Sequence, residues 1–305
     1  MKPRETATLV LLATIWGAAF LLIDVVVDEV EPLTVVGGRV LIASMVLVPV
    51  ARLAGRVMPP RESWAAVVVM AIFNNVLPFS LITAAQEHID SSLAATLIGT
   101  MPLFVLLITF AAGTERPSPA RVLGLVIGFV GAVVVIGPDL GDITSSNTLG
   151  KLAVLGASLC YGISAVVARQ WAKGPPLSLS AGQLVIAAAI SLPIALVVDG
   201  PHVGAISAKG AFAWLALGIV CSGVAYILFY DLVQRVTATQ ASLVAYLIPI
   251  VATVLGWAVL GERIGPNLFV GLALILVGVM AVNGVLASAA GVFRTAGAEE
   301  LEPGA

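Results

Sequence analysis

Asp24 and Arg39 are the two residues whose chemistry stands out first, because each interrupts a long apolar run. If those runs cross a membrane, each charge costs roughly 2.5–3.5 kcal/mol even on a lenient scale, and such residues usually serve an ion or substrate pathway. One interpretation is a gate pair, or a site for a charged group of a solute. The alternative is that Arg39 reaches the membrane surface on its long stem and Asp24 only marks a helix end.

Aromatic and amide side chains near the middle of the apolar runs form a second group of candidates. Trp16 needs a hydrogen-bond partner for its indole N–H at that depth, whether it lines a cavity or fills helix packing. Asn74 and Asn75 point about 100° apart on a helix, so we expect at most one to face a pathway while the other bonds a neighbouring helix. The expected solute-contacting residues are Trp16, Asn74, Asn75, Phe79, Tyr161, Tyr226, Tyr230 and Tyr246.

Two prolines, Pro102 and Pro249, lie near the middle of further apolar runs. Proline removes one helical hydrogen bond and clashes with the carbonyl four residues earlier, so the carbonyls of Ile98 and Ala245 are expected to be free. In lipid such a break is tolerated only against protein or a watery cavity. The prolines therefore predict either kinks that shape a central cavity and its gates, or static packing kinks.

Composition indicates a membrane protein before any motif is considered. Of the 305 residues 60% are hydrophobic and 10% charged, whereas soluble domains average about 45–50% apolar and about 25% charged residues. The formal net charge of −2 argues against a nucleic-acid-binding face. Cys160 and Cys221 both lie in apolar runs and are expected to be free thiols.

Ten stretches are long and apolar enough to cross a bilayer, which takes roughly 20 residues each. They predict an all-α integral membrane protein with short connections and a disordered cytoplasmic tail at 289–305. The expected helices cover about 7–27, 32–54, 64–86, 91–113, 119–137, 149–171, 178–198, 209–234, 239–261 and 266–288.

Loop charges predict how these helices are oriented. Eleven of the fifteen Lys and Arg residues fall in the two termini and the alternate loops on one side, and three fall on the other side. The side rich in Lys and Arg is normally cytoplasmic. We therefore expect a multi-pass protein of the cell inner (plasma) membrane with both termini in the cytoplasm, and Asp24 and Arg39 both in the outer half.

An internal repeat relates two parts of the chain. Residues 100–137 align without a gap with residues 247–284 after a shift of 147. Charged residues are scarce in this chain, so a matching Glu-Arg pair is more informative than matching apolar residues. The shift pairs Pro102 with Pro249, Glu115 with Glu262, Arg116 with Arg263, and Gly124, Gly131 and Gly137 with Gly271, Gly278 and Gly284.

The repeat unit contains five helices, an odd number, so its two copies are expected to have opposite orientations. Glu115 would then face the cytoplasm and Glu262 the outside. Such inverted repeats are typical of secondary transporters, whose substrate site lies near the bilayer midplane between the halves. The fold expected is therefore ten transmembrane helices in two inverted five-helix repeats, at 1–138 and 139–288.

The chain resembles the drug/metabolite transporter superfamily, and specifically two tandem EamA-type domains. The residues that carry the resemblance are WGAAF at 16–20, Arg39, MPLF…ER at 101–116, SLVAYLIPIVATVLGWAVLGERIGP at 242–266, and the glycine-rich fifth and tenth helices. The first repeat departs from the pattern, with AAGTER in place of VLGER. The resemblance covers nearly the whole chain and implies ten helices and transport of small metabolites, often export, without fixing the solute.

The function predicted is a secondary transporter, in the first instance an exporter, of small polar metabolites or drugs that works by alternating access. An importer or facilitative carrier of the same solutes is the alternative, because the sequence does not give the direction. If transport is coupled to protons, Asp24 and then Asp231 are the expected acids. The gating or coupling residues expected are Asp24, Arg39, Pro102, Pro249 and Asp231.

Other function classes lack their motifs in this sequence. There is no GxxxxGK[ST] nucleotide loop, no GxSxG nucleophile and no His/Cys cluster with metal-ligand spacing. An intramembrane enzyme would need clustered His, Asp or Cys, and a channel would need a polar filter or charged rings. We expect no catalytic residue, cofactor or metal, and no nucleic-acid partner. The partners expected are a small-molecule solute and the lipid bilayer, and the GxxxG at 124–128 fits close contact inside the protein or in a homodimer.

Overall fold

The computed structural model describes residues 1–55, 58–137, 142, 144–201 and 204–285, and these residues are helical with no strands. The boundary expected at 138/139, the tail expected at 289–305 and the end of the tenth helix lie outside the described residues. The helices are α1 Pro3–Val27, α2 Pro32–Leu53, η1 Arg61–Ser63, α3 Trp64–Ala71, η2 Ile72–Val76, α4 Leu77–Ala85, α5 Ser91–Ile98, α6 Met101–Ala111, α7 Pro119–Ile136, α8 Ser146–Trp171, α9 Pro176–Val198, α10 Ala208–Ala216, η4 Leu217–Val224, α11 Ala225–Val233, α12 Ala238–Leu255, η5 Gly256–Leu260 and α13 Pro266–Val282.

Local sequence signals account for most helix boundaries. Five helices (α1, α2, α7, α9 and α13) begin with proline, whose missing N–H costs nothing at a position that has no helical partner. Side-chain hydroxyls cap α7 and three further helices, α8, α10 and α12, by accepting a hydrogen bond from the backbone of the first turn. These capping residues are Ser118, Ser145, Ser207 and Thr237.

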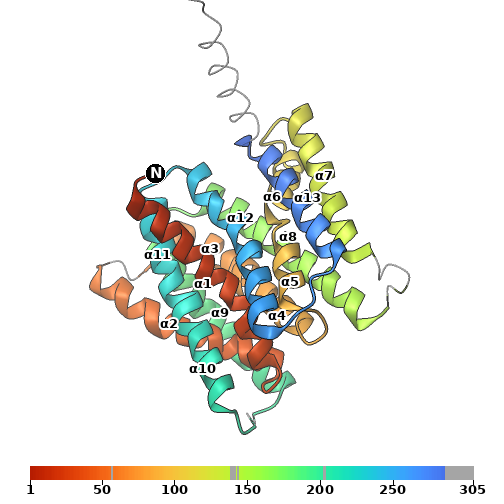
Figure 1. Cartoon of the computed structure of the whole chain (residues 1–305). Helices are drawn as coiled ribbons and strands as arrows, with labels where there is room; N and C mark the ends of the chain where they lie inside the picture. Colours follow the sequence, from red (N-terminus) through yellow and green to blue (C-terminus); the bar gives the residue numbers. More distant parts are fainter. Residues whose placement is uncertain (56–57, 138–141, 143, 202–203, 286–305) are drawn as a thin grey trace, which may run out of the picture.

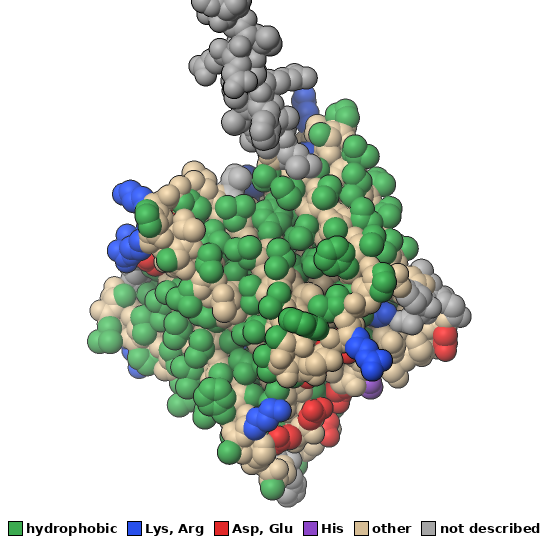
Figure 2. Space-filling view, viewed as in Figure 1, with side chains coloured by type: hydrophobic (Ala, Val, Ile, Leu, Met, Phe, Trp, Pro, Cys, Tyr) green, Lys and Arg blue, Asp and Glu red, His purple; other side chains and the backbone are tan. Residues whose placement is uncertain are grey.

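The helices are long and apolar enough for a membrane. Within the described residues nine stretches of 18 or more residues qualify as candidate spans, and α13 is a shorter apolar helix of 17 residues. That length is at the lower limit of what crosses a bilayer. Figure 2 shows a hydrophobic surface between two ends where charged side chains gather. Val197, Phe212 and Phe269 are among the largely exposed apolar side chains of the protein. The prediction of an all-α membrane protein is confirmed.

Four of the spans are interrupted where the sequence predicted continuous helices. Two of them contain a π-helical segment in the middle, η2 between α3 and α4 and η4 between α10 and α11. Another π-helical segment, η5, ends the span that begins with α12. The span that begins at Ser91 breaks at Gly99 and Thr100, directly before Pro102. Segments of π-helix inside α-helices are often found at functional sites.

Four sets of neighbouring helices build the bundle (Figure 1). Helix α7 packs along α13, and α2 packs along α9. Helix α1 packs on α12, while α8 packs on α4, α5 and α6. Each pair joins segments far apart in the sequence, so the first and second halves of the chain are interleaved rather than separate.

Glycines let α7 and α13 approach each other closely. A Cβ added at Gly278 would lie 2.5 Å from the backbone nitrogen of Gly128 and 2.6 Å from the carbonyl oxygen of Gly124. Gly131 faces the backbone of α13 in the same way, at Gly271. The glycine spacing therefore serves a contact inside the protein, where small residues replace the missing hydrophobic drive between helices in lipid.

Gly278→Ala is expected to destabilise the protein, because its new methyl group would have to displace backbone rather than a flexible side chain. Gly156→Ala is the matched control, since the nearest atom to its Cβ would be 3.7 Å away and alanine favours a helix by about 1 kcal/mol over glycine. Thermal unfolding in detergent should give a lower midpoint for Gly278→Ala and an equal or higher one for Gly156→Ala. Equal midpoints for the two variants would contradict the close α7–α13 contact.

Candidate functional site: a central polar cluster

Six polar side chains from four spans meet in the interior of the bundle. We call them the central polar cluster: Arg39 of α2, Asn74 and Asn75 of η2, Gln183 of α9, Ser222 of η4 and Tyr226 of α11. Four of them, Arg39, Asn75, Gln183 and Ser222, are buried. Hydrocarbon supplies no hydrogen-bond partners, so these side chains must satisfy one another or a bound molecule.

Arg39 is held on two sides. Its Nε donates a hydrogen bond to Ser222 Oγ at 2.9 Å, and its guanidinium carbon lies 3.8 Å from the centre of the Phe79 ring. Tyr161 and Tyr226 are close enough to act on its charge. Among the described residues no carboxylate lies within ion-pair distance of Arg39.

The amide side of the cluster is a network of four side chains. Asn74 Nδ2 donates to Tyr226 Oη at 2.9 Å and to Gln183 Oε1 at 3.4 Å. Asn75 Nδ2 donates to the same Gln183 oxygen at 3.3 Å, and Tyr226 donates to Asn75 Oδ1 at 3.1 Å.

The expectation that Asn74 and Asn75 would turn to different sides is wrong, because both reach Gln183 and Tyr226. The two residues lie in the π-helical segment η2. Adjacent residues on a helix point about 100° apart, but the long side chains of Gln183 and Tyr226 reach both amides. The two amides therefore belong to one site.

The amide network should be measurable as a coupling energy. In a double-mutant cycle, Asn75→Ala and Gln183→Ala are expected to couple by about 0.6 kcal/mol, with about 1.7 kcal/mol as the upper range for hydrogen bonds between membrane helices. Asn75→Ala paired with Thr109→Ala is the control, because Thr109 bonds its own helix at Leu106. Additive Asn75 and Gln183 effects on unfolding would contradict the network.

The predicted aromatic residues fall into two groups. Trp16 packs with Phe229 at 5.4 Å between ring centres and donates its indole N–H to the carbonyl of Cys221 in η4, at 3.1 Å. Phe79, Tyr161 and Tyr226 surround Arg39, and Tyr230 packs with the same apolar core as Tyr161 and Tyr226. Tyr246 lies apart, since its hydroxyl bonds Asn283 and the Val279 carbonyl at the end of α13.

The two predicted prolines have different surroundings. Pro102 follows the break between α5 and α6, and the Ile98 carbonyl accepts a hydrogen bond from Ser158 of α8 at 3.1 Å. The carbonyl that the sequence predicted to be free is thus satisfied by a neighbouring helix. Pro249 lies inside the continuous helix α12.

Asp24 and Arg39 do not form an ion pair. The charged groups that act on Asp24 are Glu262, Asp28, Asp90 and Lys209, near the end of α1. Burial raises the pKa of Asp90, the residue before α5, and the charge of Glu262 adds to the rise. Asp231, the other predicted acid, pairs with Arg235 through a 2.6 Å contact at the opposite end of the bundle.

Three carboxylates cap helix N-termini of other spans at the end of the bundle that contains Asp24. Glu262 accepts from the backbone N–H groups of Ser91 and Ser92 at the start of α5, at 2.8 and 3.1 Å. Glu29 accepts from Ser207 before α10, and Asp199 accepts from Thr34 in α2. We call these contacts the three carboxylate caps.

Hydrogen bonds from Ser207 lower the pKa of Glu29, so its cap is complete at neutral pH and is lost only as the pH falls through that lowered value.

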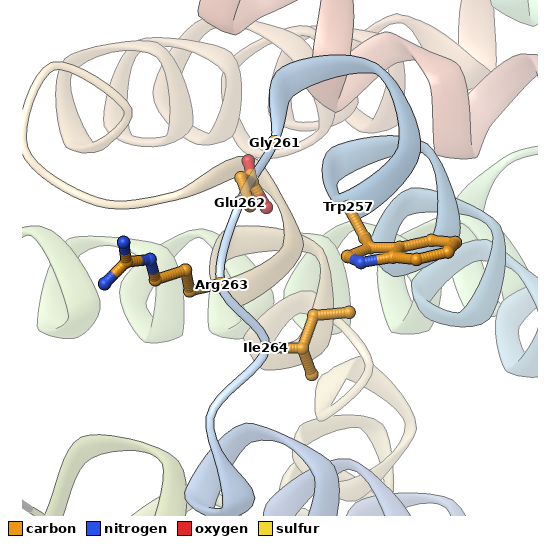
Figure 3. Close-up of a pocket in the computed structure, with 5 residues that line it drawn as sticks. All are labelled: Trp257, Gly261, Glu262, Arg263 and Ile264. Atoms are coloured by element: carbon orange, nitrogen blue, oxygen red, sulfur yellow. The ribbon is translucent and has the colours of Figure 1, made fainter.

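Beside the Glu262 cap lies an open surface pocket of about 480 Å³, lined by Trp257 and residues 261–264. Figure 3 shows Arg263 pointing away from Trp257 there. This pocket lies at the end of η5, away from the central polar cluster.

The site residues expected from the sequence include neither Gln183 nor Ser222, although a signal was present. The stretches 32–43 (PLTVVGGRVLIA) and 176–187 (PLSLSAGQLVIA) align without a gap and place Arg39 opposite Gln183. A shift of 147 places Asn75 opposite Ser222. Arg39 bonds Ser222 and Gln183 bonds Asn75, so the two contacts occupy corresponding positions in the two halves.

Comparison with known families identifies the family and finds two matching segments. The family model described as "EamA-like transporter family" matches residues 5–137 and again residues 148–284. The chain belongs to the EamA-like transporter family. It is therefore a multi-pass membrane protein of a transporter family, as the resemblance predicted, and the family points to transport rather than catalysis.

Two similar proteins are also named as transporters. "Uncharacterized transporter YoaV" of Bacillus subtilis is 24% identical over 267 residues, which cover 87% of this chain and 91% of YoaV. "Uncharacterized inner membrane transporter YedA" of Escherichia coli K12 is 26% identical over 274 residues, which cover 88% of this chain and 87% of YedA. A solved structure titled "Crystal structure of protein" shares the fold, with a TM-score of 0.65, 21% identity, and coverage of 92% of this chain and 98% of its own.

Proposed function

We propose that this EamA-family protein is a secondary transporter that exports small polar metabolites across the inner membrane by alternating access between two inverted five-helix repeats. The central polar cluster is the proposed solute site. Tyr161, Tyr230, Phe79 and Trp16 are proposed to line it. Both termini are proposed to lie in the cytoplasm, in keeping with the distribution of Lys and Arg.

The observation that carries this proposal is that every major helix contact has a counterpart when the halves are exchanged. The pairs α7–α13 and α2–α9 map onto themselves, and the α1–α12 contact maps onto the contact of α8 with α5 and α6. The contact of α2 with η4 maps onto that of α9 with η2. This correspondence between the helix contacts of the two halves supports inverted repeats, in which one half moves against the other around a fixed site.

The ends of the bundle support a gating role for the loops between spans. On the side that loop charges assign to the outside, the three carboxylate caps tie α5, α10 and α2 to other spans. At the opposite end Glu115 pairs with Arg121 at 2.8 Å and with Arg169 at 3.6 Å. Opening to the outside would require the caps to break while contacts at the other end persist.

Solute counterflow tests the transport proposal. Purified protein in liposomes preloaded with an unlabelled metabolite should take up the same labelled metabolite transiently above equilibrium, and the initial rate should saturate. A panel of amino acids, organic acids, sugars and nucleosides covers the small polar class. Empty liposomes are the control, and a non-saturating flux near free diffusion would favour a channel instead.

Cysteine labelling tests the opposite orientation of the two halves. Arg116 and Arg263 are exposed and equivalent under the shift of 147, and both native cysteines are buried, which lowers the background. In intact cells, a membrane-impermeant maleimide should label Arg263→Cys, whereas Arg116→Cys should react only after permeabilisation. Labelling of both variants from the same side would rule out inverted repeats.

An importer or a facilitative carrier would use the same architecture, and the direction of net flux in cells separates these from an exporter. An enzymatic function has less support, because the described residues contain no group of three or more His, Cys, Asp or Glu side chains that could hold a metal ion. The proposed solute site likewise contains amides, hydroxyls and one guanidinium, and no paired acid and base.

A further inference from the structure

The guanidinium of Arg39 has more hydrogen-bond donors than partners. Its side chain is 6% exposed, and of its five N–H groups only the one on Nε has an acceptor among the described residues, Ser222. The two terminal nitrogens have no acceptor among the described residues, and they are not among the fully enclosed side-chain atoms without a partner, so they border space within the bundle. A buried charge that lacks both an ion-pair partner and full hydrogen bonding is strongly unfavourable in a membrane interior.

The side chains around Arg39 do not neutralise it. Phe79 covers one face of the guanidinium, and Tyr161, Tyr226 and Cys221 are the groups that act on its charge. Tyrosine and cysteine side chains are ordinarily neutral at pH 7. Asp24, the acid that the sequence suggested as a partner, interacts instead with groups at the end of the bundle. The protein therefore holds a fixed positive charge at the proposed solute site.

We propose that the terminal nitrogens of Arg39 bind the carboxylate of a small monoanionic solute, which names the substrate class of the transport site proposed above and rests on that function. Ser222 fixes Nε and Phe79 fixes one face, so the edge formed by the two terminal nitrogens is left for a ligand. A planar guanidinium edge matches a carboxylate with two parallel hydrogen bonds.

Charge balance favours a monocarboxylate over a phosphate monoester. One guanidinium cancels one carboxylate, whereas a phosphate group carrying about −1.5 to −2 charges at pH 7 would leave excess negative charge inside the bundle. No other described cation lies in the central polar cluster. Tyr226, which acts on Arg39 and bonds both Asn74 and Asn75, links the guanidinium to amides that can bind a second polar group of the solute.

Ligand-induced stabilisation tests this site without relying on transport. Thermal unfolding of the purified full chain at pH 7 is followed with benzoate, with its neutral counterpart benzamide, and with inorganic phosphate. Benzoate should raise the midpoint in a saturable way and benzamide and phosphate should not. Arg39→Gln should weaken the apparent benzoate affinity about 10- to 100-fold, and Arg39→Lys should weaken it less because the charge is kept without the planar edge.

Two further variants separate binding from folding. Arg52→Gln, at the exposed end of the same helix, is the matched control and should keep the benzoate response. Arg39→Met should leave the ligand-free midpoint unchanged or higher, because it removes an uncompensated buried charge. A lower ligand-free midpoint for Arg39→Met, together with equal responses to benzoate and benzamide in the natural protein, would assign Arg39 to structure and overturn the inference.

The outcomes also distinguish this inference from the transport proposal. A benzoate response that depends on Arg39, with no counterflow of any solute, would support the carboxylate site and contradict transport. Counterflow of neutral and acidic solutes at rates that Arg39→Gln leaves unchanged would support transport and overturn the carboxylate site. Stabilisation by phosphate equal to that by benzoate would overturn the choice of a monocarboxylate.

Discussion

A membrane interior provides no water to hydrogen-bond, and this constraint explains where the polar groups of the protein lie. Trp16 donates to the Cys221 carbonyl, Ser158 donates to the Ile98 carbonyl four residues before Pro102, and Asn75 is fully buried within an amide network. Each of these contacts joins two different spans. Polar satisfaction therefore also fixes which helices are neighbours, and Arg39 stands out because its partners are incomplete.

The same constraint favours small residues where helices meet. Lipid tails are as apolar as leucine, so burying leucine between helices gains little, whereas close backbone contact gains dispersion energy. Gly124, Gly128 and Gly278 provide that contact between α7 and α13. This pair lies to one side of the bundle in Figure 1, while the polar cluster joins α2 and α9 to the π-helical segments. The glycine-mediated contact and the polar cluster thus lie on different pairs of helices, although α2 and α9 also share an apolar core.

Motion between the halves would have to overcome the contacts at the ends of the bundle. A carboxylate at a helix N-terminus contributes typically about 0.3–1 kcal/mol where it is exposed and up to about 2 kcal/mol where it is partly buried. The Glu29 cap is exposed, whereas the Glu262 and Asp199 caps are partly buried and therefore stronger. Binding of a solute at the centre could supply a comparable free energy, which is the condition for a ligand to shift a two-state equilibrium.

The sequence alone determined the membrane class, the positions of most helices, the family and the scarcity of charged residues inside the spans. These features follow from composition, hydrophobic runs and proline positions, which are local and strongly patterned in lipid. The sequence also identified Arg39 and the two asparagines as candidates, because polar residues are rare enough in an apolar run to be noticed individually.

Only the tertiary structure decided which of these residues meet. Asn74 and Asn75 share partners because Gln183 and Tyr226, from two other spans, reach both of them, and no local propensity in IFNNV predicts that η2 is a π-helix. Gln183 and Ser222 are ordinary polar residues until helix packing places them beside Asn75 and Arg39. Asp24 and Arg39 lie on consecutive helices, yet each faces different neighbours. Hydrogen bonds between spans depend on rotation and crossing of whole helices, which are set by the sum of many packing contacts and not by any short stretch of sequence.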